Sequence, residues 1–565
     1  MSVNPKFVFR PLLFSLAIAL AASVLLAQEP VTIHIDARSP QGPLRPVWKY
    51  FGYDEPNYTY AKHGQELVGE LGALSPTPVY IRTHNLLTSG DGTPSLKWGS
   101  TNAYTEDASG KPVYDWTIVD RIFDTYLEAG AKPFVEIGFM PQALSLHPEP
   151  YRHNWPMGAL DTGWTSPPKD FKKWGELVRQ WVLHSVARYG KAEVESWYWE
   201  VWNEPDLTMY YWHGTPEDYD KLYDFAADAV KRALPTARVG GPASTGPAGK
   251  SGAPFLKQFL EHCAHGHNYA SGKTGAPLDF ISFHAKGHPD MVGDHVRMGL
   301  SNQLLDVDRG FAIVTAFPQF ARLPIVLTES DPEGCAACSA RTHPANAYRN
   351  GTLYPTYVAL ATASERKLAE KYKVNLEGAL TWAFEFEDQP SFEGFRTLAT
   401  NGVDKPVLNI FRMAGLMRGQ ALKLESSGAL SLEAMIQSGV RHAPDIDGVA
   451  AREDREITAM LWNYHDEEAP AEDSPVEVKL TGVPLTVKRV RLEHYRIDRD
   501  HSNAYTVWKQ MGSPEAPSPE QTAQLQAAGQ LQTLGSPRWI ANQAGTVDVK
   551  FSLPRQAVSL LEFSW

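Results

Sequence analysis

Short apolar runs alternate with longer amphipathic stretches from about residue 45 to residue 420 of the chain. The apolar runs are rich in Val, Ile, Phe, Tyr and Trp, which favour strands. The longer stretches repeat apolar residues at helical intervals, most clearly over residues 116–129 and 171–189. The predicted strands cover residues 47–55, 78–84, 132–140, 197–204, 237–244, 280–286, 324–329 and 379–387. Eight strand–helix repeats predict an α/β fold, a (β/α)8 TIM barrel.

The pattern changes after about residue 420, where helical periodicity becomes sparse outside residues 518–528. Short, partly alternating strands are predicted at 457–463, 476–480, 488–496, 547–553 and 557–563. Strands of this kind separated by turns predict a β-sandwich. A chain of 565 residues also exceeds one compact domain. We therefore expect a catalytic barrel over 28–420 and a sandwich over 421–565, with an early strand at 31–35 as a candidate partner of the sandwich.

The first 27 residues have the pattern of a secretory signal peptide. Lys6 and Arg10 precede an apolar run from Leu12 to Ala27, and the chain then turns polar. A membrane anchor is the alternative, but the run is shorter than the roughly 20 residues that span a bilayer. We expect cleavage after Ala27, a periplasmic or secreted protein, and no stable membrane insertion after cleavage.

Composition narrows the classes of partner. The net charge of −12, without a basic cluster beyond the N-terminus, argues against nucleic acid. The three cysteines are Cys263, Cys335 and Cys338. Their spacing from nearby histidines matches no standard zinc pattern, so we expect no metal and no cofactor. A local Cys335–Cys338 disulfide is favoured in an exported protein, and two free thiols are the alternative.

Polar residues end several of the predicted barrel strands, where the carboxyl ends of barrel strands meet. Two carboxylates each terminate an apolar strand: Glu204 after Val201-Trp202, and Glu329 after Pro324-Ile325-Val326-Leu327-Thr328. Two carboxyl groups facing one pocket suit glycoside hydrolysis, with retention at a separation of about 5–5.5 Å and inversion at a wider one. The alternative is two carboxylates in separate salt bridges.

These motifs together resemble glycoside hydrolase family 39, which contains β-xylosidases and α-L-iduronidases. The resemblance covers nearly the whole chain after the leader and rests on residues 51–58, 82–84, 200–205, 280–284, 328–332, 495–498 and 501–505. It implies a barrel with a β-sandwich and retaining catalysis. By this likeness Glu204 matches the acid/base, Glu329 the nucleophile and Asn203 a residue that binds a sugar hydroxyl. His84, His284 and Asp54 match the glycone-binding motifs.

The motifs do not by themselves choose the sugar of the substrate. The substrates of the family differ at C5, where a uronide carries a carboxylate. Lys286, Arg396 and Gly334 are similar to residues that bind this carboxylate in the iduronidase branch. Residues 333–338 and 383–390 instead resemble a group of bacterial β-xylosidase-like sequences, and their acidic residues Glu333, Glu385 and Glu387 could neutralise both cations.

We therefore predict a retaining exo-glycosidase that removes non-reducing-end β-D-xylosyl residues from xylan-derived oligosaccharides. The alternatives are an α-L-iduronidase-like or other exo-glycosidase, and a catalytically inactive carbohydrate-binding protein. An oligosaccharide or glycoside is the expected partner in each case. The oligomeric state does not follow from the sequence.

Overall fold

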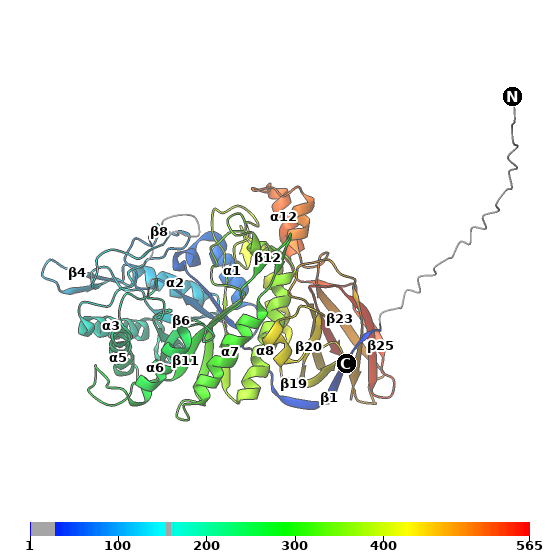
Figure 1. The fold of residues 1–565 in the computed structure, drawn as a ribbon, viewed down its shortest axis with the longest axis horizontal. Coiled ribbons are helices and arrows are strands. Elements are labelled where there is room, and N and C mark those ends of the chain that lie inside the picture. The colour runs from blue at the N-terminus through cyan, green and yellow to red at the C-terminus, as the bar shows by residue number, and fades with distance from the viewer. Residues whose placement is uncertain (2–28, 154–159, 162, 209) are drawn as a thin grey trace.

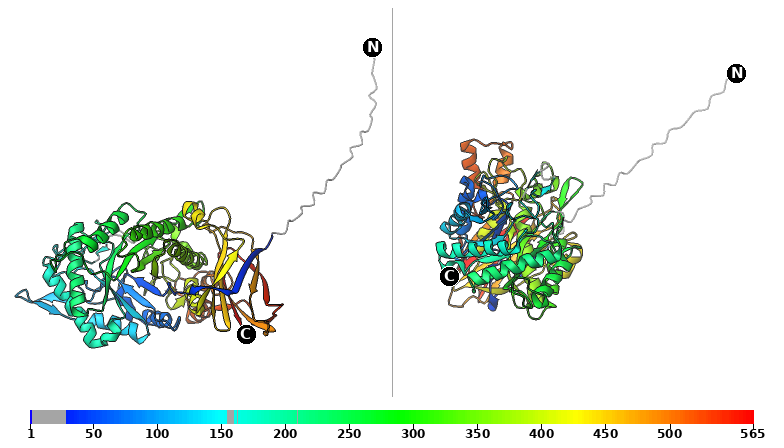
Figure 2. Two further views of the ribbon diagram at one scale, coloured as in Figure 1. Left: turned by 90° about the horizontal axis from the view of Figure 1, so that it is seen from below. Right: turned by 90° about the vertical axis from the view of Figure 1, so that its left-hand side faces the viewer.

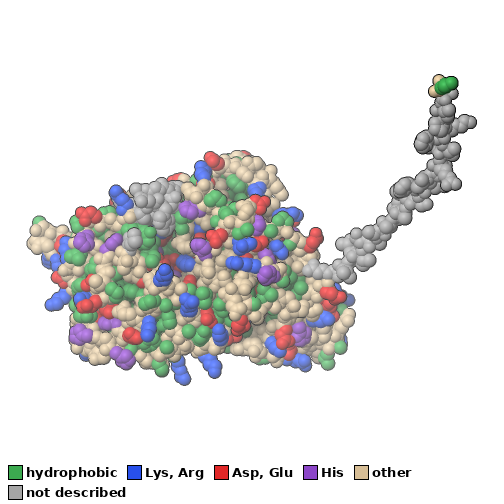
Figure 3. Space-filling model, in the orientation of Figure 1, with side chains coloured by type: hydrophobic (Ala, Val, Ile, Leu, Met, Phe, Trp, Pro, Cys, Tyr) green, Lys and Arg blue, Asp and Glu red, His purple; other side chains and the backbone are tan. Residues whose placement is uncertain are grey.

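The computed structural model describes residues 1, 29–153, 160–161, 163–208 and 210–565. Apart from Met1, the predicted signal peptide lies outside these described residues. Within them, no helix combines the length and the apolar composition that a membrane crossing requires. Acidic and basic side chains are interspersed over the face seen in Figure 3.

The larger part of the chain forms a closed ring of parallel strands surrounded by helices (Figures 1 and 2). The strands are β2 (Tyr50–Tyr53), β3 (Tyr80–Thr83), β6 (Lys132–Ile137), β9 (Tyr198–Val201), β10 (Arg238–Ser244), β11 (Phe280–Lys286), β14 (Pro324–Asp331), β15 (Asn375–Ala379) and β16 (Thr381–Trp382). β15 and β16 are two halves of the eighth strand: β15 pairs with β14, and β16 pairs with β2 and closes the ring. The predicted (β/α)8 barrel is confirmed.

The helices follow the strands in the expected alternation. They are α1 (Lys62–Gly72), α2 (Thr117–Glu128), α3 (Phe171–Tyr189), α4 (Lys191–Val194), α5 (Pro216–Ala233), α6 (Gly252–His265), α7 (Leu300–Thr315), α8 (Leu353–Tyr372) and α9 (Pro406–Leu416). Short two-stranded pairings in the loops join β4 (Tyr104–Glu106) to β5 (Pro112–Tyr114), β7 (Arg152–His153) to β8 (Leu160–Asp161), β12 (Asp290–Val292) to β13 (His295–Arg297), and β17 (Ala399–Thr400) to β18 (Val403–Asp404).

The eighth strand differs from its prediction. It was expected at 379–387 but occupies residues 375–382, so Glu385 and Glu387 lie beyond its end. The apolar residues Ala383, Phe384 and Phe386 resemble a strand in the sequence. They lie beyond the strand and are buried, with Phe384 stacked on Tyr53 and Phe386 packed on Phe395. The true first half of the strand contains Asn375, Glu377 and Gly378, a composition that hides it.

Aromatic rings fill the lower half of the barrel. Tyr50 stacks on Tyr80, with ring centroids 5.2 Å apart, and Phe134 stacks on Tyr198 at 4.8 Å. These rings come from adjacent strands at matched register positions. Many of the aromatic residues therefore serve the core rather than a sugar site. The packed floor leaves the carboxyl ends of the strands as the open end.

The smaller unit is one continuous ten-stranded sheet. It contains β1 (Val31–Pro43), β19 (Gln420–Ser426), β20 (Asp445–Glu453), β21 (Glu456–Tyr464), β22 (Ser474–Thr481), β23 (Arg489–Ile497), β24 (Gln532–Thr533), β25 (Arg538–Ala541), β26 (Thr546–Leu553) and β27 (Ala557–Ser564). β1 runs antiparallel to β19 and parallel to β22, so the N-terminal strand belongs to this sheet. Inward residues of distant strands share one core, because the sheet curls around itself as a sandwich. Three short helices accompany the sheet: α10 (Leu432–Ser438), α11 (Ala504–Gln510) and α12 (Pro519–Gly529).

Candidate active site

Glu204 is held at the open end of the barrel by an unusual strand end. β9 stops at Val201, and both Trp202 (φ 74°) and Glu204 (φ 43°) adopt left-handed backbone conformations. The Glu204 backbone N–H donates to the Ala243 carbonyl at 2.9 Å, and the Trp202 indole N–H donates to the Tyr211 carbonyl at 2.7 Å. Left-handed non-glycine residues are costly and persist where surrounding contacts impose them. These contacts turn the Glu204 side chain into the mouth of the barrel.

Glu329 lies opposite on β14, with only 8% of its side chain exposed. The Lys286 ammonium donates to its carboxylate at 2.6 Å. Arg82, His84 and His284 place nitrogen atoms 3.6, 3.7 and 3.9 Å from Glu329 Oε1. Burial alone would raise the pKa of Glu329, but His284, Lys286, His84 and Arg82 together hold this pKa well below its usual range. Glu329 is therefore ionised near neutral pH.

His284 connects the two carboxylates. Its Nδ1 lies 2.8 Å from Glu204 Oε1, and strand register places it beside Glu329. One carboxylate oxygen of Glu204, one of Glu329 and one nitrogen of His284 all lie within 4.8 Å of one another. Within the described residues these three are the one group of His, Cys, Asp and Glu that could hold a metal ion. The expectation that no metal is needed stays a prediction.

Arg82 forms the floor beneath this pair and is completely buried. Its guanidinium contacts Glu200 at 2.5 Å, Glu136 at 2.9 Å and the Asn203 carboxamide oxygen at 3.0 Å. The pKa of Arg82 is raised by these carboxylates despite burial. Arg82 thus fixes Asn203, whose Nδ2 is buried without a protein partner and is left available for a ligand oxygen.

His84 and Asp54 make the deep wall of the site. His84 Nδ1 lies 2.6 Å from Glu136, and its Nε2 lies 3.3 Å from Asp54. Lys97 donates to Asp54 at 2.6 Å. Burial works to raise the pKa of Asp54, but Lys97 and His84 lower it below its usual value. The wall is thus a network of hydrogen bonds and ion pairs that runs from Lys97 through Asp54 and His84 to Glu136.

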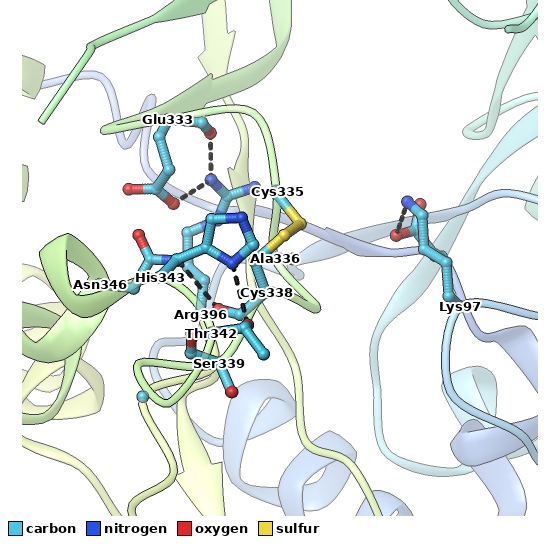
Figure 4. Close-up of a disulfide and its surroundings, with 12 residues drawn as sticks. Lys97, Glu333, Cys335, Ala336, Cys338, Ser339, Thr342, His343, Asn346 and Arg396 are labelled. Atoms are coloured by element: carbon cyan, nitrogen blue, oxygen red, sulfur yellow. Dashed lines mark hydrogen bonds and ion pairs between the residues drawn. A yellow bond between two sulfur atoms is a disulfide. The ribbon is translucent and has the colours of Figure 1, made fainter. Parts of the chain in front are cut away.

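The two cations singled out for a uronate, Lys286 and Arg396, both lie against carboxylates. Lys286 contacts Asp331 at 2.6 Å in addition to Glu329. Arg396 is completely buried, and its Nη1 contacts Glu333 at 2.6 Å (Figure 4). Its Nε donates to the Trp382 carbonyl at 2.8 Å. The sequence therefore identified one compensating carboxylate, Glu333, and missed Asp331.

Glu385 and Glu387 do not neutralise these cations, contrary to the expectation from the sequence. Glu385 accepts from the Gly402 backbone N–H at 2.7 Å, and Glu387 contacts His63 at 3.0 Å. The displaced end of the eighth strand explains the difference, because both residues lie in the loop after it. Burial, with the nearby charge of Glu387, raises the pKa of Glu385 to about 8.

The open side of the site is a cleft of about 580 Å³. The predicted site residues Glu204, Lys286 and Gly334 line this cleft together with Glu333. The other polar and aromatic residues of its lining are Tyr151, Tyr210, Tyr211, His288, His343 and Asn346. Cys335 and Cys338 also line it and form a disulfide (Figure 4). Asn203, His84, Asp54 and Arg396 lie behind this surface in the buried wall.

The structure thus places the predicted site residues at one end of the barrel, and it adds charged residues that the sequence did not single out. Glu136, Glu200 and Lys97 were not predicted as site residues. The two glutamates interrupt apolar strands, Phe134-Val135-Glu136-Ile137 and Trp199-Glu200-Val201, and a charge inside a buried strand is a usable signal. Lys97 lies in a long loop with no such signal.

Comparison with known proteins places this geometry in a family. The model of glycosyl hydrolases family 39 matches residues 31–542. A β-xylosidase of Geobacillus stearothermophilus is 28% identical over 496 residues, covering 86% of each chain. The α-L-iduronidase of Mus musculus is 26% identical over 540 residues, covering 89% of this chain and 76% of the relative.

A solved structure has the same fold. The monomeric β-xylosidase from Caulobacter crescentus CB15 superposes with a TM-score of 0.74 at 24% identity, covering 94% of this chain and 99% of that one. The family match spans both the barrel and most of the sandwich, and it contains every residue of the site described above. The chain belongs to glycosyl hydrolases family 39.

Proposed function

We propose that this protein is a retaining exo-glycosidase that releases β-D-xylosyl residues from non-reducing ends. The proposal on the sugar rests on one observation. The site cations Arg82, Lys97, Lys286 and Arg396 each lie within 3 Å of a carboxylate oxygen. A uronate carboxylate entering such a site would meet compensated charges and nearby carboxylates, whereas a neutral pentose adds no charge.

The proposed chemistry begins with Glu329 as the nucleophile. Its ionised carboxylate attacks the anomeric carbon while the bond to the leaving oxygen breaks. Glu204 donates a proton to that oxygen, and a glycosyl ester on Glu329 results. Water then gives a proton to Glu204 and its oxygen to the anomeric carbon, which frees Glu329. The distance between the two carboxylates supports retention, because an oxygen of Glu204 lies within 4.8 Å of an oxygen of Glu329. An inverting enzyme needs a wider gap that holds the attacking water.

The shape of the site supports exo action. Asp54, His84 and Lys97 form a buried wall beside the paired carboxylates and do not line the cleft, whose lining includes Tyr151 and Tyr210. A sugar against this wall has no space for a further residue beyond it. Asn203 and His84 would bind hydroxyl groups of this terminal sugar.

An α-L-iduronide is the second candidate because Lys286 lines the cleft with 17% of its side chain exposed. The test is to assay the purified protein on aryl β-D-xyloside and aryl α-L-iduronide side by side. We expect the xyloside to be cleaved with retention, observed by NMR of the first product. Cleavage of the iduronide with an inert xyloside would support the second candidate, and no activity on any glycoside would support a binding protein.

Two substitutions test the roles of the carboxylates. Glu204→Ala and Glu329→Ala should each nearly abolish turnover, and azide should rescue Glu329→Ala with inverted product. Glu176→Ala is a matched control, because Glu176 is an ion-paired glutamate on α3 outside the site. Full activity of Glu329→Ala without azide would contradict the nucleophile assignment.

A further inference from the structure

A second cavity lies between the barrel and the curled sheet, away from the active site. It is bounded by the segment before β2, helices α8 and α9, and strands β20 and β21. Its volume is about 60 Å³, and its lining is largely apolar, including Val47, Trp48, Phe411, Met417, Val449 and Met460. A water needs roughly 10–15 Å³ on this scale, so the space fits one ring or a short alkyl chain. Figure 1 shows α8 between the rest of the barrel and the sheet.

An open cleft of about 470 Å³ adjoins this cavity and shares Arg45, Val47 and Arg366 with it. Arg45, Arg322, Arg366 and Lys373 line the cleft, and Glu370 is the one carboxylate among its lining residues within the described chain. We call Arg45, Arg322, Arg366 and Lys373 the cationic rim. The rim is positively charged although the net charge of the whole chain is −12. A positive cleft on an acidic protein attracts anions locally.

Arg366 stands at the junction of the two spaces. Its side chain is half-buried, and over the part of the chain that the structure describes no acceptor lies within hydrogen-bond or ion-pair distance of its guanidinium. Desolvation lowers the pKa of Arg366, and the charge of Glu370 opposes this only in part. The buried arginines Arg82, Arg349 and Arg396 instead have carboxylate partners within 3 Å. A half-buried guanidinium with five donors and no acceptor is suited to an external anion.

We propose that this interdomain cavity binds a small hydrophobic carboxylate. The apolar body would enter the space beside Trp48 and Phe411, and the carboxylate would bind Arg366 inside the cationic rim. An inorganic anion would satisfy the rim but leave the apolar cavity unfilled. A neutral apolar molecule would leave Arg366 without its acceptor. The site lies below the barrel, near the N-terminal end of β15, whereas Glu329 is at the C-terminal end of β14.

Binding to this site bridges the two structural units, so it should stabilise the folded protein. The full chain is titrated with phenylacetate by calorimetry and by thermal unfolding, with phenylacetamide and inorganic phosphate as matched probes. We expect saturable binding of phenylacetate and a higher unfolding temperature, with at least tenfold weaker binding of both controls. Equal effects of phosphate would show an adventitious rim site and overturn the proposal, as would no binding of phenylacetate.

Two variants locate the site. Arg366→Met removes the anion partner, and Ala363→Leu fills the cavity from α8 while leaving the rim intact. Each should weaken phenylacetate at least tenfold, whereas Arg179→Met, on the outer face of α3, should not. Undiminished binding in Ala363→Leu would overturn the proposal even if Arg366→Met failed to fold.

Discussion

Lys286 is the residue through which the ionisation of Glu329 can be tested most directly. The Lys286 ammonium lies 2.6 Å from Glu329 and 2.6 Å from Asp331. The nitrogen atoms of Arg82, His84 and His284 are all more than 3 Å from the Glu329 carboxylate. Lys286→Met keeps most of the side-chain volume and removes the charge. The remaining neighbours Arg82, His84 and His284 stand 3.6 to 3.9 Å away. The substitution therefore removes the Lys286 hydrogen bond to Glu329 together with the one to Asp331, and it leaves the more distant cationic neighbours of Glu329 in place.

The size of the effect follows from the bond to Glu329. A hydrogen bond to a charged group contributes about 1.5–3 kcal/mol, and about 1.4 kcal/mol corresponds to a tenfold change in an equilibrium. Losing Lys286 should thus favour protonation of Glu329 by roughly 10- to 150-fold. The lower part of this range is expected, because 17% of the Lys286 side chain is exposed to screening solvent. The acid limb of kcat/KM should move to higher pH, since only ionised Glu329 can attack.

The assay is hydrolysis of aryl β-D-xyloside across the acid range, with kcat/KM plotted against pH. Lys173→Met is the matched control, because Lys173 contacts Glu106 at 2.7 Å far from the cleft. We expect an upward shift of the acid limb in Lys286→Met and none in the control. An unchanged acid limb in Lys286→Met would refute the electrostatic account of Glu329.

Glu333→Gln should raise the kcat/KM ratio of α-L-iduronide to β-D-xyloside about tenfold, the effect of roughly 1.4 kcal/mol. The reason is that Arg396 loses the nearer of two compensating carboxylates, Glu333 at 2.6 Å, and keeps Asp331 at 3.6 Å. An unchanged ratio would contradict the role of charge compensation. Burial raises the pKa of Glu365 from its ordinary 4.5 to about 7, so the folded state retains a proton that the unfolded chain loses between these values. Wild type should therefore lose up to about 3 kcal/mol more unfolding free energy than Glu365→Gln as pH rises through this window. The same dependence of unfolding free energy on pH in both proteins, measured by urea unfolding at several pH values, would disprove this. Replacing Cys335 and Cys338 with serine should lower the unfolding free energy by about 2 kcal/mol, the chain-entropy value for so short a loop; no change in the urea midpoint would show that the other contacts of the loop suffice to hold it.

The barrel could be predicted because most of its buried parallel strands carry an apolar signal in the sequence. The predicted bounds equal the observed ones for strand Phe280–Lys286 and for helix Phe171–Tyr189. In both segments the pattern of apolar residues continues from end to end. β19 (QALKLES) was missed because its exposed residues Gln420, Lys423 and Glu425 leave few apolar positions. The eighth strand was misplaced because its packing against the first strand, rather than its composition, selects it.

The site was predictable where chemistry coincides with a strand end. Glu204 and Glu329 each follow an apolar run, so their side chains had to meet at one edge of the barrel. Lys97 and Asp331 were out of reach for different reasons. Lys97 reaches the site from a loop whose path no periodicity describes, and Asp331 lies two positions beyond Glu329 at a register level that only the pairing of β11 with β14 reveals.

The choice of sugar depends on pairs of charges rather than on single residues. Lys286 and Arg396 in a sequence indicate an acidic ligand, since a cation facing a cleft attracts an anion. In the folded protein, Asp331 and Glu329 flank Lys286, and Glu333 contacts Arg396. The same cations then hold carboxylates of the protein in place, and the ionised nucleophile is one of them. Two proteins with identical cations can therefore prefer different sugars if one of them lacks a compensating carboxylate. In this protein the substitution Glu333→Gln tests that argument.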